Sequence, residues 1–143
     1  MLKYTFLTDK FYNDYKNCVE IEEKTDRPYI RIKICVDGVW WAIPMRSNIK
    51  HKYAIWTDKE NKCGIDLSKA VVIEKPEEYL DTTRQPYIRP NEHKEIKKLS
   101  EHQVSEKLKK YIKDYKAAKE NQRNERNKNI VKCSTLQYFE NYI

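Results

Sequence analysis

Glycine is nearly absent from this chain, with two residues in 143. Phosphate-binding loops built from backbone amides need several glycines close together, so P-loop and dinucleotide-binding proteins are excluded. No apolar run approaches the roughly 18 residues that a membrane-spanning helix requires. The N-terminal stretch MLKYTFLTDKFY also lacks the pattern of a secretory signal. We therefore expect a cytoplasmic protein that has no membrane partner.

Metal-binding and cofactor-binding patterns are also missing. The four cysteines form no C-x-x-C pair, and the three histidines form neither H-x-x-x-H nor H-E-x-x-H. No D-x-D cluster of a two-metal nuclease occurs. Ser47 and His51 are four residues apart, but no G-x-S-x-G turn is present to build a hydrolase site. We expect reduced thiols, no metal and no cofactor.

Cationic and aromatic residues are what the chain has in abundance. Lys and Arg number 29 against 22 Asp and Glu, for a formal net charge of +7. This balance favours an anionic partner, with nucleic acid ahead of a membrane surface. Eleven Tyr, three Trp and three Phe supply enough apolar surface for a packed core. The length predicts one domain, residues 1–143, with a sheet core over about 1–90 and a helical part over about 91–143.

The clearest structural signal is a β-hairpin in PYIRIKICVDGVWWAIPMRS, residues 28–47. Apolar residues alternate on its first strand, and Asp37-Gly38 is a two-residue turn that fixes the register. One face should be core, with four cross-strand pairs: Val36–Val39, Ile34–Trp41, Ile32–Ile43 and Ile30–Met45. The other face should be aromatic and cationic. Pro44 cannot donate to a ladder, which predicts a sheet edge or a strand exit there.

The remaining elements complete an α+β class. We predict further strands at residues 2–7, 53–57, 67–74, 87–89 and 131–133. Thr8 should cap a helix from Asp9 to about Asn17. A short helix should end near Leu99, and a capping box at Ser100 should start a long helix with a polar tail. A second capping box at Ser134 opens a short terminal helix. The expected architecture is a small, strongly bent antiparallel sheet or partly open barrel carrying these helices.

A polar segment, residues 46–52, follows the apolar strand WWAIPM. Such a segment is either a solvated strand end or a site. Metal-independent RNA cleavage needs a base for the ribose 2′-OH, cations for the phosphorane and an acid for the leaving oxygen. The segment and the basic strand beside it supply Arg, Lys, His, Tyr and Ser for these tasks.

Three stretches together resemble a known family: FLTDKFYNDY, the hairpin through Arg46-Ser47, and the closing KCSTLQYFENYI. The chain is similar to the toxins of type III toxin–antitoxin systems, the ToxN/AbiQ family, and most of all to its CptN and TenpN branches. The resemblance implies a metal-independent endoribonuclease with a sheet core related to the Kid/MazF toxins. It implies products with a 2′,3′-cyclic phosphate, and inhibition by a small RNA pseudoknot. It also implies a closed protein–RNA assembly bridged by RNA.

The resemblance places the active site on Arg46, Ser47, Arg27 and Lys50, with His51 adjacent. We expect Arg27, Arg46 and Ser47 to stabilise the phosphate and phosphorane, and His51 or Lys50 to transfer protons. Arg46 stands where ToxN-like members have Thr. Further RNA contacts are expected from Tyr29, Arg31, Lys33, Trp40, Asn48, Lys52, Lys109 and Lys113. For Trp40, burial in a second small core is the competing interpretation.

Two other functions are compatible with the same residues. The cationic face would also suit a non-catalytic RNA- or DNA-binding module. The long helix would suit a protein-interaction module, whose binding would be insensitive to salt.

Overall fold

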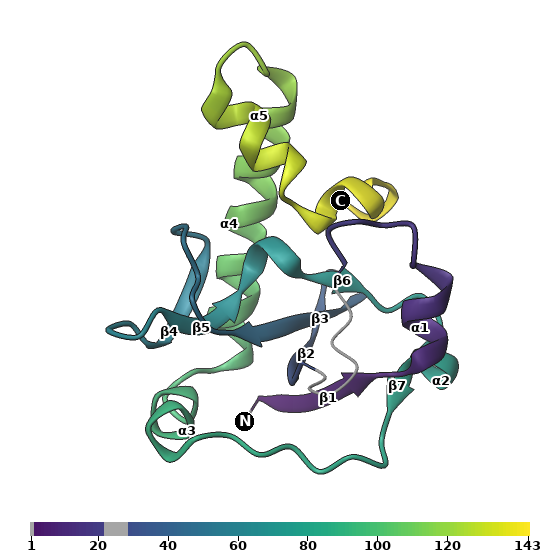
Figure 1. Ribbon diagram of the computed structural model, residues 1–143, viewed down its shortest axis with the longest axis vertical. Coiled ribbons are helices and arrows are strands. Elements are labelled where there is room, and N and C mark those ends of the chain that lie inside the picture. Colours follow the sequence, from purple (N-terminus) through teal and green to yellow (C-terminus); the bar gives the residue numbers. More distant parts are fainter. Residues whose placement is uncertain (1, 22–28) are drawn as a thin grey trace.

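The computed structural model describes residues 2–21 and 29–143, and within them it has an α+β architecture (Figure 1). Seven antiparallel strands form one open sheet in the order β4-β5-β3-β2-β1-β7, with β6 also paired to β3. The strands are β1 (Lys3–Leu7), β2 (Arg31–Val36), β3 (Val39–Arg46), β4 (Ala54–Asp58), β5 (Cys63–Asp66), β6 (Val71–Val72) and β7 (Leu80–Asp81). The antiparallel α+β class is as predicted, and the sheet does not close into a barrel.

The β2–β3 hairpin has the predicted register. Ile34 pairs with Trp41 and Ile32 with Ile43, and the amide of Met45 donates to the carbonyl of Ile30 at 2.8 Å. Asp37 and Gly38 have φ angles of 51° and 81°, as a type I′ turn requires. The face that was expected to be core is buried at Ile32, Ile34, Val36, Trp41 and Ile43.

Pro44 does not mark a sheet edge, and that prediction is wrong. β3 is flanked by β2 on one side and by β6 and then β5 on the other. Pro44 falls between Ala42, which pairs with β6, and Met45, which pairs with β5. A missing amide is tolerated there because β3 changes partner at that residue.

The other strand predictions had mixed outcomes. β1 and β4 are confirmed, whereas β5 and β7 were not predicted. Only Val71–Val72 of the segment 67–74 is strand, because a 3-10 turn, η1 (Leu67–Lys69), precedes it. Residues 87–89 are not strand. Residues 131–133 lie at the end of a helix, so the strand predicted there is wrong.

The helices are α1 (Asp9–Asp14), α2 (Pro76–Tyr79), α3 (Pro90–Ile96), α4 (Glu101–Glu120) and α5 (Glu125–Lys132). Thr8 caps α1, and Ser100 with Gln103 forms the predicted capping box of α4. The polar tail of the long helix is not continuous with it: α4 ends at Glu120, and Asn124 caps a separate α5. The Ser134 cap opens a 3-10 turn, η2 (Thr135–Tyr138), instead of an α-helix, and a second 3-10 turn, η3 (Glu140–Tyr142), follows it.

α4 lies against the sheet and extends beyond it, with α5 folded back beside its end (Figure 1). Its apolar stripe faces the core, with Val104 and Leu108 fully enclosed and Tyr111 and Tyr115 nearly so. One cluster of buried side chains extends from Leu2 to Phe139 and joins the sheet to the helices. None of the helices in residues 2–21 and 29–143 is both long and apolar enough to cross a membrane.

Candidate functional site

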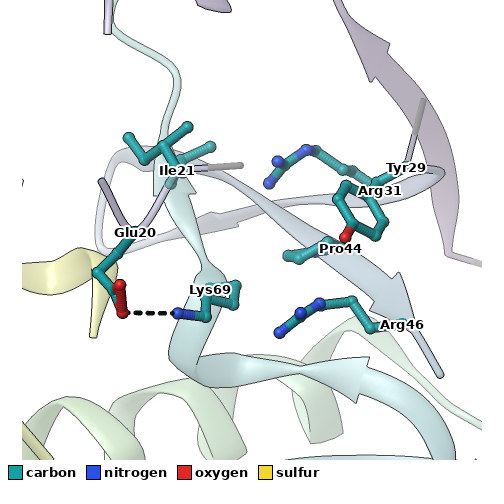
Figure 2. A pocket seen from close by; sticks show the side chains of 8 residues that line it. Glu20, Ile21, Tyr29, Arg31, Pro44, Arg46 and Lys69 are labelled. Carbon is teal, nitrogen blue, oxygen red and sulfur yellow. Dashed lines mark hydrogen bonds and ion pairs between the residues drawn. The ribbon is translucent and has the colours of Figure 1, made fainter. Parts of the chain in front are cut away.

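A basic pocket opens beside the end of β3 (Figure 2). Segments remote in sequence line it: the chain after α1, the start of β2, the end of β3 and η1. Its lining includes Glu20, Tyr29, Arg31, Pro44, Arg46 and Lys69. Three of these side chains are cationic and one is anionic, so the pocket favours an anion.

Arg31 is the most unusual residue of the pocket, because 2% of it is exposed. One guanidinium nitrogen, Nη1, lies 3.5 Å from the carbonyl oxygen of Ala42, and Nε has no hydrogen-bond partner in the described parts of the chain. No carboxylate among the described residues forms an ion pair with Arg31. A buried charge of this kind is costly unless an opposite charge compensates it. The pocket therefore holds a cation that an anionic ligand would neutralise.

Arg46 and Lys69 extend into the same pocket. The guanidinium carbon of Arg46 lies 5.8 Å from the ring centroid of Tyr29, a cation–π contact. The Lys69 ammonium lies 3.1 Å from a carboxylate oxygen of Glu20 and 2.8 Å from the carbonyl oxygen of Cys133. Glu20 thus neutralises Lys69, and an entering anion would compete with this carboxylate.

Asp66 anchors Arg46 from beneath. This carboxylate ends β5, is fully buried, and caps η1 by accepting from the Ser68 amide at 3.0 Å. Oδ2 is 2.9 Å from Nη1 of Arg46, and Oδ1 is 3.2 Å from Nε2 of His51. The Ser68 hydroxyl donates to Oδ1 at 2.6 Å. Burial alone would raise the pKa of Asp66, but the hydrogen bonds from His51 and Ser68 and the Arg46 charge together lower it.

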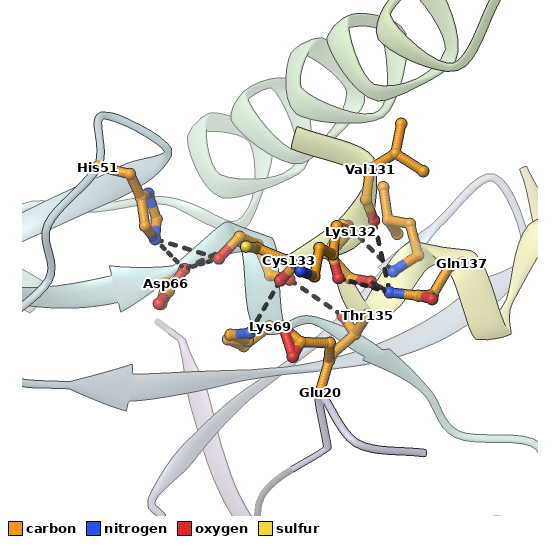
Figure 3. A network of polar contacts seen from close by, with 12 residues as sticks. Glu20, His51, Asp66, Lys69, Val131, Lys132, Cys133, Thr135 and Gln137 are labelled. Carbon is orange, nitrogen blue, oxygen red and sulfur yellow. Dashed lines mark hydrogen bonds and ion pairs between the residues drawn. The ribbon is translucent and has the colours of Figure 1, made fainter. Parts of the chain in front are cut away.

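His51 has both ring nitrogens engaged, and Figure 3 shows the one that faces Asp66. Nδ1 accepts from the backbone amide of Tyr53 at 3.0 Å, and Nε2 faces Asp66 and the Ser68 hydroxyl. Acceptance at Nδ1 places the proton of the neutral ring on Nε2. His51 therefore has no free acceptor nitrogen in this geometry, and it belongs to the scaffold around Asp66.

The loop between β3 and β4 turns its predicted site residues towards solvent. Ser47, Asn48 and Lys50 are exposed, whereas Ile49 is buried and its amide donates to the Lys62 carbonyl at 3.0 Å. Asn48 takes a positive φ of 57° in this turn. The structure brings Arg46 and His51 together through Asp66, but Ser47 and Lys50 do not line the pocket.

The other predicted RNA contacts are dispersed. Lys33 and Trp40 pack together on the hairpin, and Lys52 lies over the ring of Tyr53. Lys109 pairs with Asp37 at the hairpin turn, 3.6 Å away, and Lys113 is exposed on α4. These residues are not in the pocket. Arg27 lies outside the described residues.

Sequence reasoning missed Asp66, Lys69 and Glu20. A signal for Asp66 was present in G-I-D-L-S, where one carboxylate stands between two apolar residues and two positions before a serine. That pattern is typical of a buried capping aspartate, which needs a cationic or hydrogen-bonding partner. Lys69 and Glu20 carry no comparable local signal.

Within the described parts of the chain, no three His, Cys, Asp or Glu side chains cluster as a metal-ligand set. Comparison of the chain with protein-family models, curated proteins and solved structures returns no match. The case for a function therefore depends on the site itself and on the sequence motifs.

Proposed function

We propose that this protein is a metal-independent, sequence-preferring endoribonuclease, the toxin of a type III toxin–antitoxin system. The observation that carries the proposal is the buried Arg31, which has no carboxylate partner in the described chain and meets Arg46 and Lys69 in one pocket. A phosphodiester carries one negative charge, which would compensate the buried guanidinium of Arg31. The reason for proposing RNA as that ligand is the resemblance of the hairpin and C-terminal motifs to the ToxN/AbiQ family.

The chemistry needs little from the protein, because RNA supplies its own nucleophile. The ribose 2′-OH attacks the adjacent phosphorus, the bond to the 5′-oxygen breaks, and a 2′,3′-cyclic phosphate forms. Negative charge grows on the phosphorane oxygens during this step, and positioned guanidinium groups stabilise it. Arg31 and Arg46 have this role, and Asp66 fixes the direction of Arg46. The proposed proton-transfer groups are Lys50 and His51, and His51 must first leave its contacts with Tyr53 and Asp66.

The proposal extends to partners and fold. The antitoxin is a small repeated RNA pseudoknot that occupies the basic surface, and the protein and RNA form a closed, RNA-bridged assembly in the cytoplasm. A Kid/MazF-like core is part of the proposal, and the open antiparallel sheet is compatible with it. Binding of any such RNA should weaken as salt rises, because phosphate contacts release counterions.

Pocket variants test the proposal. Arg31→Met and Arg46→Gln should each lower the RNA cleavage rate by roughly a hundredfold, as expected for loss of one charge-stabilising group. Arg31→Met should leave the free energy of unfolding unchanged or raised, because it removes a buried, uncompensated charge. The measurements are single-turnover cleavage of a labelled RNA and urea unfolding of the same samples.

The matched control is Lys97→Gln, an exposed cation away from the pocket. It should cleave RNA at the wild-type rate. Wild-type cleavage by Arg31→Met and Arg46→Gln would show that the pocket is not the active site.

A second function, a non-catalytic RNA-binding module, is favoured by one observation. Both ring nitrogens of His51 are occupied, so the histidine nearest the pocket offers no free base. Under this alternative the same variants would weaken RNA binding, while the wild-type protein would leave RNA intact.

A further inference from the structure

The hairpin carries a second cationic feature outside the pocket. Lys3 on β1 lies directly opposite Lys33 on β2. Like charges at such paired positions are destabilising. Neither lysine forms an ion pair with any carboxylate of the described chain. The sheet therefore keeps two adjacent positive charges without internal compensation.

An exposed indole contacts one of these lysines, Lys33. Trp40 is 42% exposed, so it does not belong to a second core. The Lys33 ammonium lies 5.1 Å from the centroid of the Trp40 ring. The ammonium lies over one face of the ring, as in a cation–π contact. An exposed tryptophan beside a cation is a combination that binds bases and phosphates of single-stranded nucleic acid.

The strand register connects this surface to the pocket. Arg31 pairs with Pro44, Lys33 with Ala42 and Cys35 with Trp40, so all of these side chains share one face of the sheet. Trp40 is four residues from Pro44, about 13 Å along an extended strand. An RNA strand with one phosphate in the pocket and one base on Trp40 therefore spans about this distance, across the fully buried Ala42.

We propose that Lys3, Lys33 and Trp40 form a subsite for single-stranded RNA, which stacks a base on Trp40 and places phosphates near the two lysines. The orientation along β3, from the pocket towards the hairpin turn, rests on the proposed function. The subsite itself rests on the uncompensated lysine pair and the exposed indole. Its contribution is to hold substrate RNA next to the pocket and to supply part of the sequence preference through stacking.

Binding of a non-cleavable probe tests the subsite. The probe is a fluorescein-labelled, 2′-O-methylated oligonucleotide of about 12 nucleotides, within the usual site sizes of single-strand binders. Trp40→Ala should weaken its binding about tenfold or more, the effect expected for loss of one stacked base. Trp40→Phe should keep most of the affinity. Lys33→Gln should reduce the slope of log K against log salt by about 0.7, one phosphate contact on a single strand.

Tyr87→Ala is the matched control, because Tyr87 is a 77% exposed aromatic residue outside this surface. It should bind the probe like wild type. Equal binding by Trp40→Ala and wild type, or no binding of the probe by wild type, would overturn the subsite.

The two proposals fail separately. Probe binding that depends on Trp40, in a protein that leaves unmodified RNA intact, would support the subsite and refute the ribonuclease. RNA cleavage with probe binding unaffected by Trp40→Ala would refute the subsite and support the ribonuclease.

Discussion

At the scale of single residues, Asp66 holds the site together. Its carboxylate joins three segments: β5, which carries it, the end of β3 through Arg46, and the following loop through His51. Arg46 keeps partial contact with water, whereas the Asp66 side chain is fully buried. Asp66 therefore positions Arg46 towards the pocket without being part of the pocket lining.

Asp66→Asn should destabilise the fold at neutral pH by about 2 kcal/mol. The cost is below the roughly 3–5 kcal/mol of a broken, fully buried ion pair because Arg46 remains partly hydrated. The folded-state pKa of Asp66 is lowered, so its stabilisation is complete above the unfolded value of about 3.9. It is lost as the pH falls through the folded value. The stability gap between wild type and variant should therefore be constant from about pH 5 to 7 and shrink below about pH 4.

The measurement is the free energy of unfolding in urea across this pH range, with Asp37→Asn as the control. Asp37 is an exposed aspartate in the hairpin turn, where asparagine also accepts a positive φ. Its replacement should change stability by less than about 0.5 kcal/mol. If the difference in unfolding free energy between wild type and Asp66→Asn stays the same below about pH 4, the Asp66 carboxylate is not ionised and paired in the folded protein.

At the scale of elements, the β4–β5 hairpin places Asp66 and depends on a close backbone approach. A Cβ added to Gly64 would lie 2.5 Å from the carbonyl oxygen of Ile55, and backbone atoms cannot yield as a flexible side chain does. Gly64 pairs with Arg46 on β3, two residues before Asp66 on β5. The position of β5, which carries Asp66, therefore depends on the glycine at position 64.

Gly64→Ala should destabilise the protein by about 2 kcal/mol and reduce RNA cleavage, because β5 must shift away from β4 and carry Asp66 with it. Gly38→Ala is the comparison. Its Cβ would meet no atom of the described residues within 4 Å, and its cost of about 1 kcal/mol would come from the positive φ. Thermal unfolding and cleavage rates measure both effects. Full activity in Gly64→Ala would show that the position of β5 does not matter to the site.

Local patterns predicted the elements that local rules determine. Alternation and the Asp37-Gly38 turn were sufficient for the β2–β3 hairpin, and capping residues were sufficient for the starts of α1 and α4. β5 was missed because CGID is four residues long and is a strand only through its pairing with β3 and β4. The helix tail was mispredicted because Asn124 caps a new helix that the polar composition did not reveal.

Site residues were likewise predictable where they stand close together in the sequence. Arg46 and His51 stand close in sequence and were identified from one polar segment. Asp66 lies 20 residues beyond Arg46, so only folding reveals their contact. Arg31 was placed on the correct face by strand alternation, but its burial depends on packing that the pattern does not contain.

At the scale of the whole molecule, segments near both ends of the chain hold the pocket residue Lys69 in place. Glu20 reaches Lys69 from the N-terminal side, and the Cys133 carbonyl accepts from Lys69 on the C-terminal side. The Thr135 hydroxyl donates to the carbonyl oxygens of Ser68 and Ala70, which binds the C-terminal turns to η1. The chain as a whole carries a formal net charge of +7, which favours the approach of RNA.

The most direct test of the central claim is incubation of purified, antitoxin-free protein with RNA in excess EDTA, followed by analysis of the product ends. We predict discrete fragments that carry a 2′,3′-cyclic phosphate and a 5′-hydroxyl. Intact RNA under these conditions would contradict the proposed function, and so would cleavage that appears only when a divalent metal is restored.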